Sequence, residues 1–355
     1  MSLTRTAVAP TRRVLRFCRP PLSAAIDLRV AGVSAALATA ACLLGALSVS
    51  VGDFPIPLGD VVPAIFGYGD PDAFFIVNTL RLPRLLTGLA VGAAFGLSGA
   101  VFQSLARNPL ASPDVIGVNA GAAAAAVFVI VVVGGTTAQI AGGALAGALL
   151  AAIAIYLLAY RKGVSGYRLV LVGIGVTAML SSVTSYLLTR AEIFQAQQAT
   201  VWLTGSLNGR GWEHVRPVGW ALLVLVPPTL GLGRNLRVLQ LGDDAARGLG
   251  TRVERTRASL IVSAVGLAAI GTASAGPVAF VALVSPQIAR RLAGGGTPAL
   301  GPAALTGAAL MVASDLAARR LFAPTELPVG VVTAVIGAPY LLWLLARANR
   351  IGRGG

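Results

Sequence analysis

Residues 81–122 read RLPRLLTGLAVGAAFGLSGAVFQSLARNPLASPDVIGVNAGA, and this stretch contains the features that decide the fold. From Leu85 to Ala106 it carries no Asp, Glu, Lys or Arg, and glycine and alanine recur throughout. About 20 apolar residues are enough for a helix to cross the hydrocarbon core of a bilayer, roughly 30 Å thick. Small residues let such helices approach one another closely in lipid. The stretch therefore predicts a membrane-spanning helix that packs tightly against others.

The whole chain has the composition of a membrane protein. Of its 355 residues, 56% are hydrophobic and 12% are charged, whereas soluble domains carry about 25% charged residues. Five further stretches are free of charge: Val30–Val51, Val115–Val133, Ala138–Tyr160, Leu169–Thr189 and Leu327–Ala346. Two shorter stretches, Val218–Gly233 and Leu300–Ser314, are predicted to span if they extend into flanking residues.

One uncharged stretch, Ala258–Ala289, is too long for a single ordinary span. Gly276 and Pro277 near its middle end a helix, so two spans are predicted there. The total is ten, which predicts an all-α polytopic membrane protein with both termini on one side. The predicted division is an Arg-rich tail (1–29), a transmembrane domain (30–346) and a C-terminal tail (347–355).

The loop charges orient these spans. With the N-terminus inside, 21 Lys and Arg fall in cytoplasmic segments and 7 outside, while acidic residues divide as 5 and 8. Positive charge is enriched in the cytoplasmic loops of membrane proteins. Both termini are therefore predicted to be cytoplasmic, in a multi-pass protein of the cytoplasmic membrane. The net charge of +15 then reflects topology and contact with membrane lipid, and no nucleic-acid partner is predicted.

The N-terminal tail allows an alternative. TRRVLR at Thr11–Arg16 resembles a twin-arginine export signal, and ALATAA at Ala36–Ala41 resembles a cleavage site. An export signal has an apolar core of roughly 7 to 15 residues, and the apolar run Val30–Val51 is longer. We therefore expect a retained first helix.

Several kinds of chemistry are excluded. The only lysine is Lys162, so the GK[ST] of a phosphate-binding loop is absent. The only histidine is His214, so neither an H-E-x-x-H zinc site nor a histidine-based triad of the usual kind can form. No catalytic residue, metal site or cofactor is predicted, and the chain is not expected to be an enzyme.

The loops suggest where partners bind. Two long outside loops are predicted, Gly52–Arg84 and Arg190–Pro217, and the longest inside connection is Arg234–Arg257. Within the inside connection, two acidic residues suit the start of a short helix and Gly248 and Gly250 suit its end. Short helices exposed to water are marginal without a partner, so a partner surface is predicted. The alternative is an amphipathic turn lying on the lipid headgroups.

Residues 81–122, together with Leu241–Arg257, Ala275–Gly294 and Leu327–Leu345, resemble the permease family of ABC importers for iron-siderophores, haem and vitamin B12. The resemblance covers nearly the whole chain. Within that family, SGAVFQSLARNPLASPDVIG and WLTGSLNG (202–209) are most similar to ferric enterobactin permeases. The resemblance implies a type II ABC importer permease fold with ten helices per subunit.

The resemblance also implies partners. They are two cytoplasmic ABC ATPase subunits, a second permease subunit and an extracytoplasmic siderophore-binding protein; a homologous heterodimer is favoured and a homodimer is possible. The residues implied to dock into the ATPase are Asp243, Asp244, Ala245, Ala246, Arg247, Gly248, Leu249 and Gly250. Arg81, Arg84 and Arg319 are implied to meet acidic residues of the binding protein, although arginines at helix ends also anchor to lipid phosphates.

Further residues are predicted at the gate and along the pathway. Similarity to the cobalamin importer implies a cytoplasmic gate at Asn108, Leu110, Ser165 and Gly166. Small and hydroxyl residues at a helical spacing of four, Gly173, Thr177, Ser181 and Ser185, are predicted to line the pathway. Helix packing would use the same stripe equally well.

The expected function is therefore the permease subunit of an ABC importer for an iron(III)-siderophore. Cobalamin or haem is the alternative cargo. A secondary transporter without an ATPase is the rival mechanism, but such proteins usually carry ionisable residues within their spans. Asp315 and Glu326, the acidic residues next to the last two spans, are predicted to lie at the outer interface, since a charge at the bilayer centre costs about 2.5 to 3.5 kcal/mol.

Overall fold

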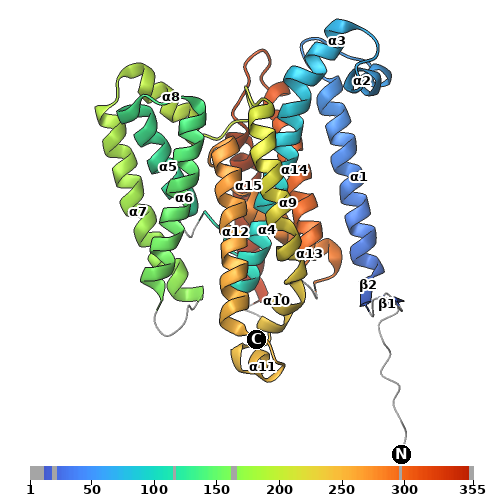
Figure 1. The fold of residues 1–355 in the computed structure, drawn as a ribbon, viewed down its shortest axis with the longest axis vertical. Helices are drawn as coiled ribbons and strands as arrows, with labels where there is room; N and C mark the ends of the chain where they lie inside the picture. Colours follow the sequence, from blue (N-terminus) through green and yellow to red (C-terminus); the bar gives the residue numbers. More distant parts are fainter. Residues whose placement is uncertain (1–11, 18–21, 115–116, 161–165, 296–297, 352–355) are drawn as a thin grey trace, which may run out of the picture.

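The computed structural model describes residues 12–17, 22–114, 117–160, 166–295 and 298–351, which form a bundle of long helices (Figure 1). The long helices are α1 (Leu28–Ser50), α4 (Leu82–Ala106), α5 (Val118–Phe128), α6 (Thr137–Ala159), α7 (Gly166–Arg190), α9 (Trp212–Gly231), α12 (Val253–Ala275), α13 (Val281–Ala293), α14 (Leu300–Arg320) and α15 (Val329–Ile351). The shorter elements are β1 (Arg12–Phe17), β2 (Leu22–Asp27), α2 (Leu58–Ile65), α3 (Pro71–Phe75), η1 (Ile76–Arg81), η2 (Val129–Val133), α8 (Ile193–Leu203), α10 (Gly233–Leu239) and α11 (Asp243–Gly248).

Each of the ten predicted spans coincides with one long helix among the described residues. Six helical runs are long and apolar enough to cross a membrane alone, and α9 with α10, bent by 49°, makes a seventh. The run from α5 through η2 and the first part of α15 are apolar but shorter. Helix α13, at 13 residues, is shorter than the roughly 20 residues that a bilayer requires. The predicted polytopic helical fold is confirmed, although not every helix is long enough to cross alone.

The two shorter predicted spans extend into flanking residues, as predicted. Helix α9 begins at Trp212 and contains Pro227 and Pro228, and the chain bends by 49° between α9 and α10. Helix α14 continues past Asp315 to Arg320, because ion pairs with arginines neutralise the Asp315 carboxylate. The predicted break at Gly276 is confirmed. Its φ of 79° suits glycine, and a Cβ there would lie 2.6 Å from the carbonyl oxygen of Trp202.

Helix α4 lies at the centre of the bundle, packed against α9, α12, α13 and α14. In the helical run Pro71–Ala106, which contains α4, 72% of the 18 most apolar consecutive residues are buried. The corresponding share is 11% in α1 and 17% in α7. Its contact with α14 is made through glycine, because Cβ atoms at Gly92 and Gly96 would overlap the carbonyl oxygens of Gly307 and Ala303. Glycine there brings the two backbones together, as predicted for the small-residue stretch.

The two ends of the bundle differ (Figure 1). Helices α2 and α3 lie at one end, and α11 projects from the other, where α1 begins. The predicted outside loops contain α2, α3, η1 and α8. In the N-terminal tail, β1 and β2 form an antiparallel pair that the sequence patterns did not indicate. The division into tails and a transmembrane domain stays a prediction.

Candidate functional sites at the two ends of the bundle

At the end that carries α2 and α3, Arg84 of α4 is held by two carboxylates. Its Nε and Nη2 lie 3.2 Å and 2.9 Å from Asp315 Oδ2 and Oδ1, a two-pronged contact, and its Nη1 lies 3.0 Å from Glu326 Oε2. The Asp315 side chain is 5% exposed and that of Arg84 13%. Arg319 joins the pair from α14, with its Nε 3.2 Å from Asp315 Oδ2. These contacts tie α4, α14 and the segment before α15 together.

The two other predicted docking arginines also have partners within the chain. Arg81 donates to the carbonyl oxygens of Val49 at 2.6 Å and Phe54 at 2.5 Å, which holds the loop after α1. Arg319 Nη2 donates to the Ser48 hydroxyl at 2.5 Å. The sequence predicted that the three arginines contact a binding protein, and it did not indicate these bonds within the chain. Their role in docking a partner stays a prediction.

The tightness of this cluster was not predicted. Asp315 is 4% exposed, because two guanidinium groups replace the water around its carboxylate. The position of Asp315 and Glu326 at the outer interface stays a prediction. The ion pair between Asp315 and Arg319 could have been predicted, because the two residues are four apart on one helix. The contact between Arg84 and Asp315 could not, because 231 residues of sequence separate them.

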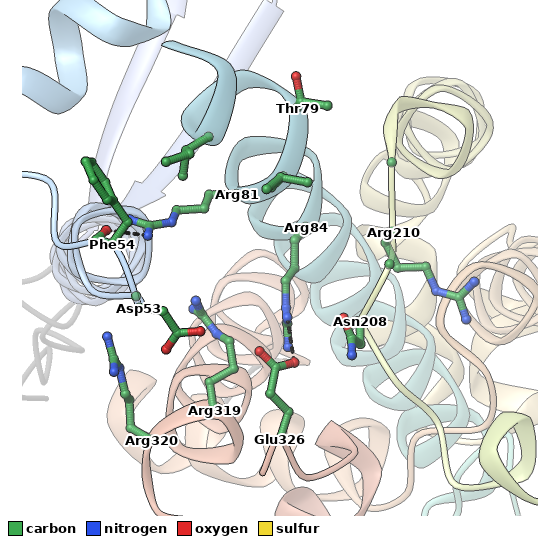
Figure 2. Close-up of a pocket in the computed structure, with 15 residues that line it drawn as sticks. Asp53, Phe54, Thr79, Arg81, Arg84, Asn208, Arg210, Arg319, Arg320 and Glu326 are labelled. Atoms are coloured by element: carbon green, nitrogen blue, oxygen red, sulfur yellow. Dashed lines mark hydrogen bonds and ion pairs between the residues drawn. The ribbon is translucent and has the colours of Figure 1, made fainter. Parts of the chain in front are cut away.

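A cavity of about 450 Å³ opens above this cluster (Figure 2). Its charged lining comprises Arg81, Arg84, Arg210, Arg319, Arg320, Asp53 and Glu326. Arg84 points at Glu326, whereas Arg210 approaches from the segment between α8 and α9 and points away from that pair. Arg210 donates to the Ser206 carbonyl at 3.2 Å, and its Nη1 lies 3.0 Å from His214 Nε2. Burial lowers the pKa of Arg210, partly offset by the nearby Glu213 charge.

A second cavity, of about 530 Å³, lies beside the first and shares Asn208, Gly209, Arg210 and Glu326 with it. Gln198, Trp202 and Ser206 add polar groups to its wall. The segment WLTGSLNG, which carried part of the family resemblance, therefore lies between the two cavities. An arrangement of arginines and amides of this kind suits contact with acidic or oxygen-rich partners.

At the opposite end, α11 occupies the predicted short helix and ends where predicted, since Gly250 has a φ of 78°. The predicted capping differs. The N-cap is Gly242, and no side chain caps it. Asp243 instead lies 2.8 Å from Arg257 Nη2 of α12, and Asp244 lies 3.1 Å from Arg247. Acidic residues in the first turn still suit the helix dipole.

The side chains of this region divide into a buried and an exposed set. Ala246 is fully buried and fixes α11 to the bundle, whereas Leu241 and Leu249 are 67% and 64% exposed. The Arg247 side chain is 58% exposed. The helix and the residues that flank it thus present two leucines and the exposed ion pair of Arg247 with Asp244 at the end of the bundle.

The predicted gate turn follows α4 directly. The Asn108 side chain accepts a hydrogen bond from the Leu110 backbone N–H at 2.9 Å, which shapes the turn. Gln287 of α13 donates to the Pro109 carbonyl at 2.6 Å. Gly166 is the first residue of α7, and Ser165 lies outside the described residues. The gate assignment stays a prediction.

The predicted stripe on α7 divides in two. Gly173 and Thr177 lie against the start of α5, where a Cβ at Gly117 would be 3.1 Å from the Thr177 hydroxyl. This half packs helices together. Ser181 and Ser185 are exposed on the surface of the described chain. The first half of the stripe therefore contacts another helix and the second half is exposed, and the pathway role of the four residues stays a prediction.

A partly buried set of polar side chains, Asp114, Asn119 and Thr272, was not predicted. Asn119 of α5 donates to Asp114 at 2.5 Å, and the Thr272 hydroxyl of α12 donates to Asn119 at 2.6 Å. These contacts join α5 to α12 and provide partners for the polar atoms of a partly buried amide.

Known proteins match over most of this length. The FecCD transport family matches residues 39–347. The ferric enterobactin transport system permease protein FepG of Escherichia coli is 41% identical over 319 residues, covering 90% of this chain and 97% of the relative. The achromobactin transport system permease protein CbrC of Dickeya dadantii is 40% identical, covering 94% and 97%. The cobalamin import system permease protein BtuC of Halobacterium salinarum is 38% identical, covering 84% and 82%.

Solved structures give the same fold. One, described as an inward-facing conformation of a transporter assigned to the metal-chelate type of ABC transporters, has a TM-score of 0.78 at 27% identity, covering 89% of this chain and 99% of that one. PsaBC from Streptococcus pneumoniae, solved with a Fab, has a TM-score of 0.54 at 16% identity and covers 80% and 94%. The long match to the family, the identity to its permeases and the shared helical fold agree. The chain belongs to the FecCD transport family.

Proposed function

We propose that this chain is the membrane-spanning permease subunit of an ABC importer that carries an iron(III)-siderophore across the cytoplasmic membrane. The identity of 41% to a ferric enterobactin permease, over nearly the full length of both proteins, carries this proposal. A second permease of this family, for achromobactin, is similar to the same degree. The arrangement of the two ends of the bundle supports the mechanism.

ATP is hydrolysed by a separate subunit that docks on α11. The chain lacks a phosphate-binding loop, so it requires such a partner. Leu241 and Leu249 are exposed next to Arg247 at the end of the bundle, and exposed apolar groups rimmed by charge are typical of a protein contact. The ion pair between Asp243 and Arg257 fixes α11 to α12, so force applied to α11 reaches a membrane-spanning helix.

An extracytoplasmic siderophore-binding protein docks at the opposite end. Five arginines and only two carboxylates line the outer cavity, and this excess of positive charge suits an acidic partner surface. Arg320 also lines the cavity, and it joins Arg81, Arg84 and Arg319 as a docking residue. Carboxylates of the partner compete with Glu326, whose side chain is 37% exposed, for Arg84.

A second permease subunit covers the exposed side of α7. Hydrophobic residues there include Ile174 and Met179, which are 55% and 71% exposed. Ser181 and Ser185 are exposed on the same helix, and hydroxyl groups in lipid favour helix–helix contacts or a water-filled route. We infer a dimer of permeases, either two copies of this chain or this chain with a related one.

Cobalamin is the second candidate cargo, because the archaeal cobalamin permease is 38% identical to this chain. Both cargoes are bulky and polar. Neither requires a fixed ionic filter within the spans, and the binding protein supplies most of the selectivity. The two candidates differ only in what the partner delivers.

Uptake of labelled ferric siderophore into iron-starved cells, with and without this gene, tests the proposal, and labelled cobalamin serves as the parallel cargo. We expect loss of iron uptake alone. Loss of cobalamin uptake alone would retain the family but reject the siderophore. Uptake that survives ATP depletion and collapses when the proton gradient is dissipated would identify a secondary transporter instead.

A further inference from the structure

Between the docking helix and the gate turn lies Arg107, the C-cap of α4, which none of the proposals above uses. We propose that Arg107 is the positioning residue that transmits movement of α11 to the turn Asn108–Leu110. This linkage rests on the proposed function, in which α11 docks on an ATPase, and on the predicted gate at Asn108 and Leu110.

The first part of the linkage is one long-range hydrogen bond. Arg107 Nη2 donates to the carbonyl oxygen of Leu239 at 2.9 Å, across 132 residues of sequence. Leu239 is the last residue of α10 and is 4% exposed. The same carbonyl accepts a hydrogen bond from the backbone N–H of Gly242 at 3.3 Å, and Gly242 is the N-cap of α11. The guanidinium is therefore attached to the turn that sets the direction of α11.

On that side, α11 is firmly attached to its surroundings. Ala246 is fully buried, and Asp243 is paired with Arg257 of α12. A displacement of α11 by a docked partner therefore moves the preceding turn, and with it the Leu239 carbonyl. A hydrogen bond that involves a charged donor is stronger than a neutral one, so Arg107 follows.

The second part of the linkage is the shape of the gate turn. Arg107 has φ 49° and ψ 32°, a left-handed conformation that is uncommon for residues other than glycine. Its neighbours hold it there. The Asn108 N–H donates to the Gln103 carbonyl at 3.2 Å, and the Leu110 N–H donates to the Asn108 side chain. The turn is thus a closed unit, and a displacement of Arg107 moves it as a whole.

A third contact supplies the fixed point against which this unit moves. Gln287 of α13 donates to the Pro109 carbonyl at 2.6 Å. Gln103, one turn before Arg107, donates to the Leu283 carbonyl at 2.9 Å and accepts from Arg290. The base of the turn is anchored on α13, while its first residue is anchored on the segment that carries α11. Relative movement of those two elements therefore changes the turn.

The experiment uses the complete importer in lipid nanodiscs, with Cys18 and Cys42 replaced by serine and Leu110→Cys as the reporter. A membrane-impermeant maleimide labels position 110, without nucleotide and after trapping with ATP and vanadate. We expect the labelling rate to change at least several-fold on trapping. In Arg107→Asn, which tolerates the left-handed backbone but lacks the guanidinium, this change is lost. Arg107→Lys, which retains a charged donor, restores part of it.

The matched control is Arg29→Ala. Arg29 Nε donates to the Leu292 carbonyl at 3.1 Å, a similar bond to the end of a different helix. We expect Arg29→Ala to keep the change in labelling rate on trapping with ATP and vanadate. We expect Arg29→Ala and Arg107→Asn both to co-purify with the ATPase and to keep its rate of ATP hydrolysis within about twofold.

An unaltered labelling response in Arg107→Asn refutes the linkage, and so does an equal loss in Arg29→Ala. Failure of any ATPase to co-purify with the chain that carries only the reporter changes refutes the proposed docking function as well. The two failures are therefore distinguishable.

Discussion

At the scale of single residues, Asp315 shows how a charge is kept in a mostly apolar bundle. Its carboxylate contacts the guanidinium groups of Arg84 and Arg319 and is almost fully buried. A buried ion pair need not stabilise a protein relative to apolar residues, but removal of one partner leaves an uncompensated charge. Removal of the Asp315 carboxylate would leave two guanidinium charges, those of Arg84 and Arg319, without this partner.

We therefore expect Asp315→Asn to destabilise the protein by about 3 to 5 kcal/mol, the range for a broken buried pair. Thermal unfolding of the purified protein in detergent measures this loss. Glu326→Gln is the matched control, since that side chain is 37% exposed and a partly solvated pair contributes about 0 to 1 kcal/mol. Equal losses in the two variants would contradict the assignment of Asp315 as the centre of the cluster.

At the scale of elements, the bundle depends on the close contact of α4 with α14. Gly96 faces the carbonyl oxygen of Ala303, and neither backbone can move aside as a flexible side chain would. Where no hydrophobic effect drives helices together, such close backbone packing supplies much of the attraction.

We expect Gly96→Ala to destabilise the protein by about 1 to 3 kcal/mol, as overpacking usually does. Gly142→Ala on α6 is the control, because nothing lies within 4 Å of its added Cβ, and alanine favours a helix over glycine by up to about 1 kcal/mol. Unfolding temperatures of the two variants give the comparison. An unchanged unfolding temperature in Gly96→Ala would show that α4 and α14 are less closely packed than in this structure.

At the scale of the whole molecule, the two ends have different chemistry. The end with α11 is also where α1 begins, and the other end carries α2, α3 and the arginine-lined cavity. The bias of 21 Lys and Arg against 7 predicts that the α11 end is cytoplasmic.

This orientation predicts that a fluorescent protein fused to the C-terminus is fluorescent in cells and that alkaline phosphatase fused there is inactive, because each requires the opposite compartment. A phosphatase inserted after Gly69, in the predicted outside loop, is expected to be active. An active C-terminal phosphatase would reverse the orientation and move the proposed ATPase contact to the wrong side.

The positions of the elements could be predicted from the sequence because lipid imposes a simple rule on each segment by itself. An uncharged run such as Leu85–Ala106 must be a helix, and the break at Gly276 needs only local backbone freedom. The short helix α11 could likewise be predicted, since its acidic start and the glycines at its end lie within eight residues. What the local pattern did not contain was the distant partner of a residue such as Asp315, whose contact with Arg84 depends on helix packing.

What the sequence by itself determined is therefore the class of protein, the order and approximate bounds of its helices, the bias of its loop charge and the place of α11. The tertiary structure alone decided the partners: that Arg84 meets Asp315, that Asn119 meets Thr272 and that Arg107 meets Leu239. Helix formation depends on neighbours along the chain, whereas these contacts join residues more than 100 positions apart. They exist only when the helices have packed, so no local pattern could specify them.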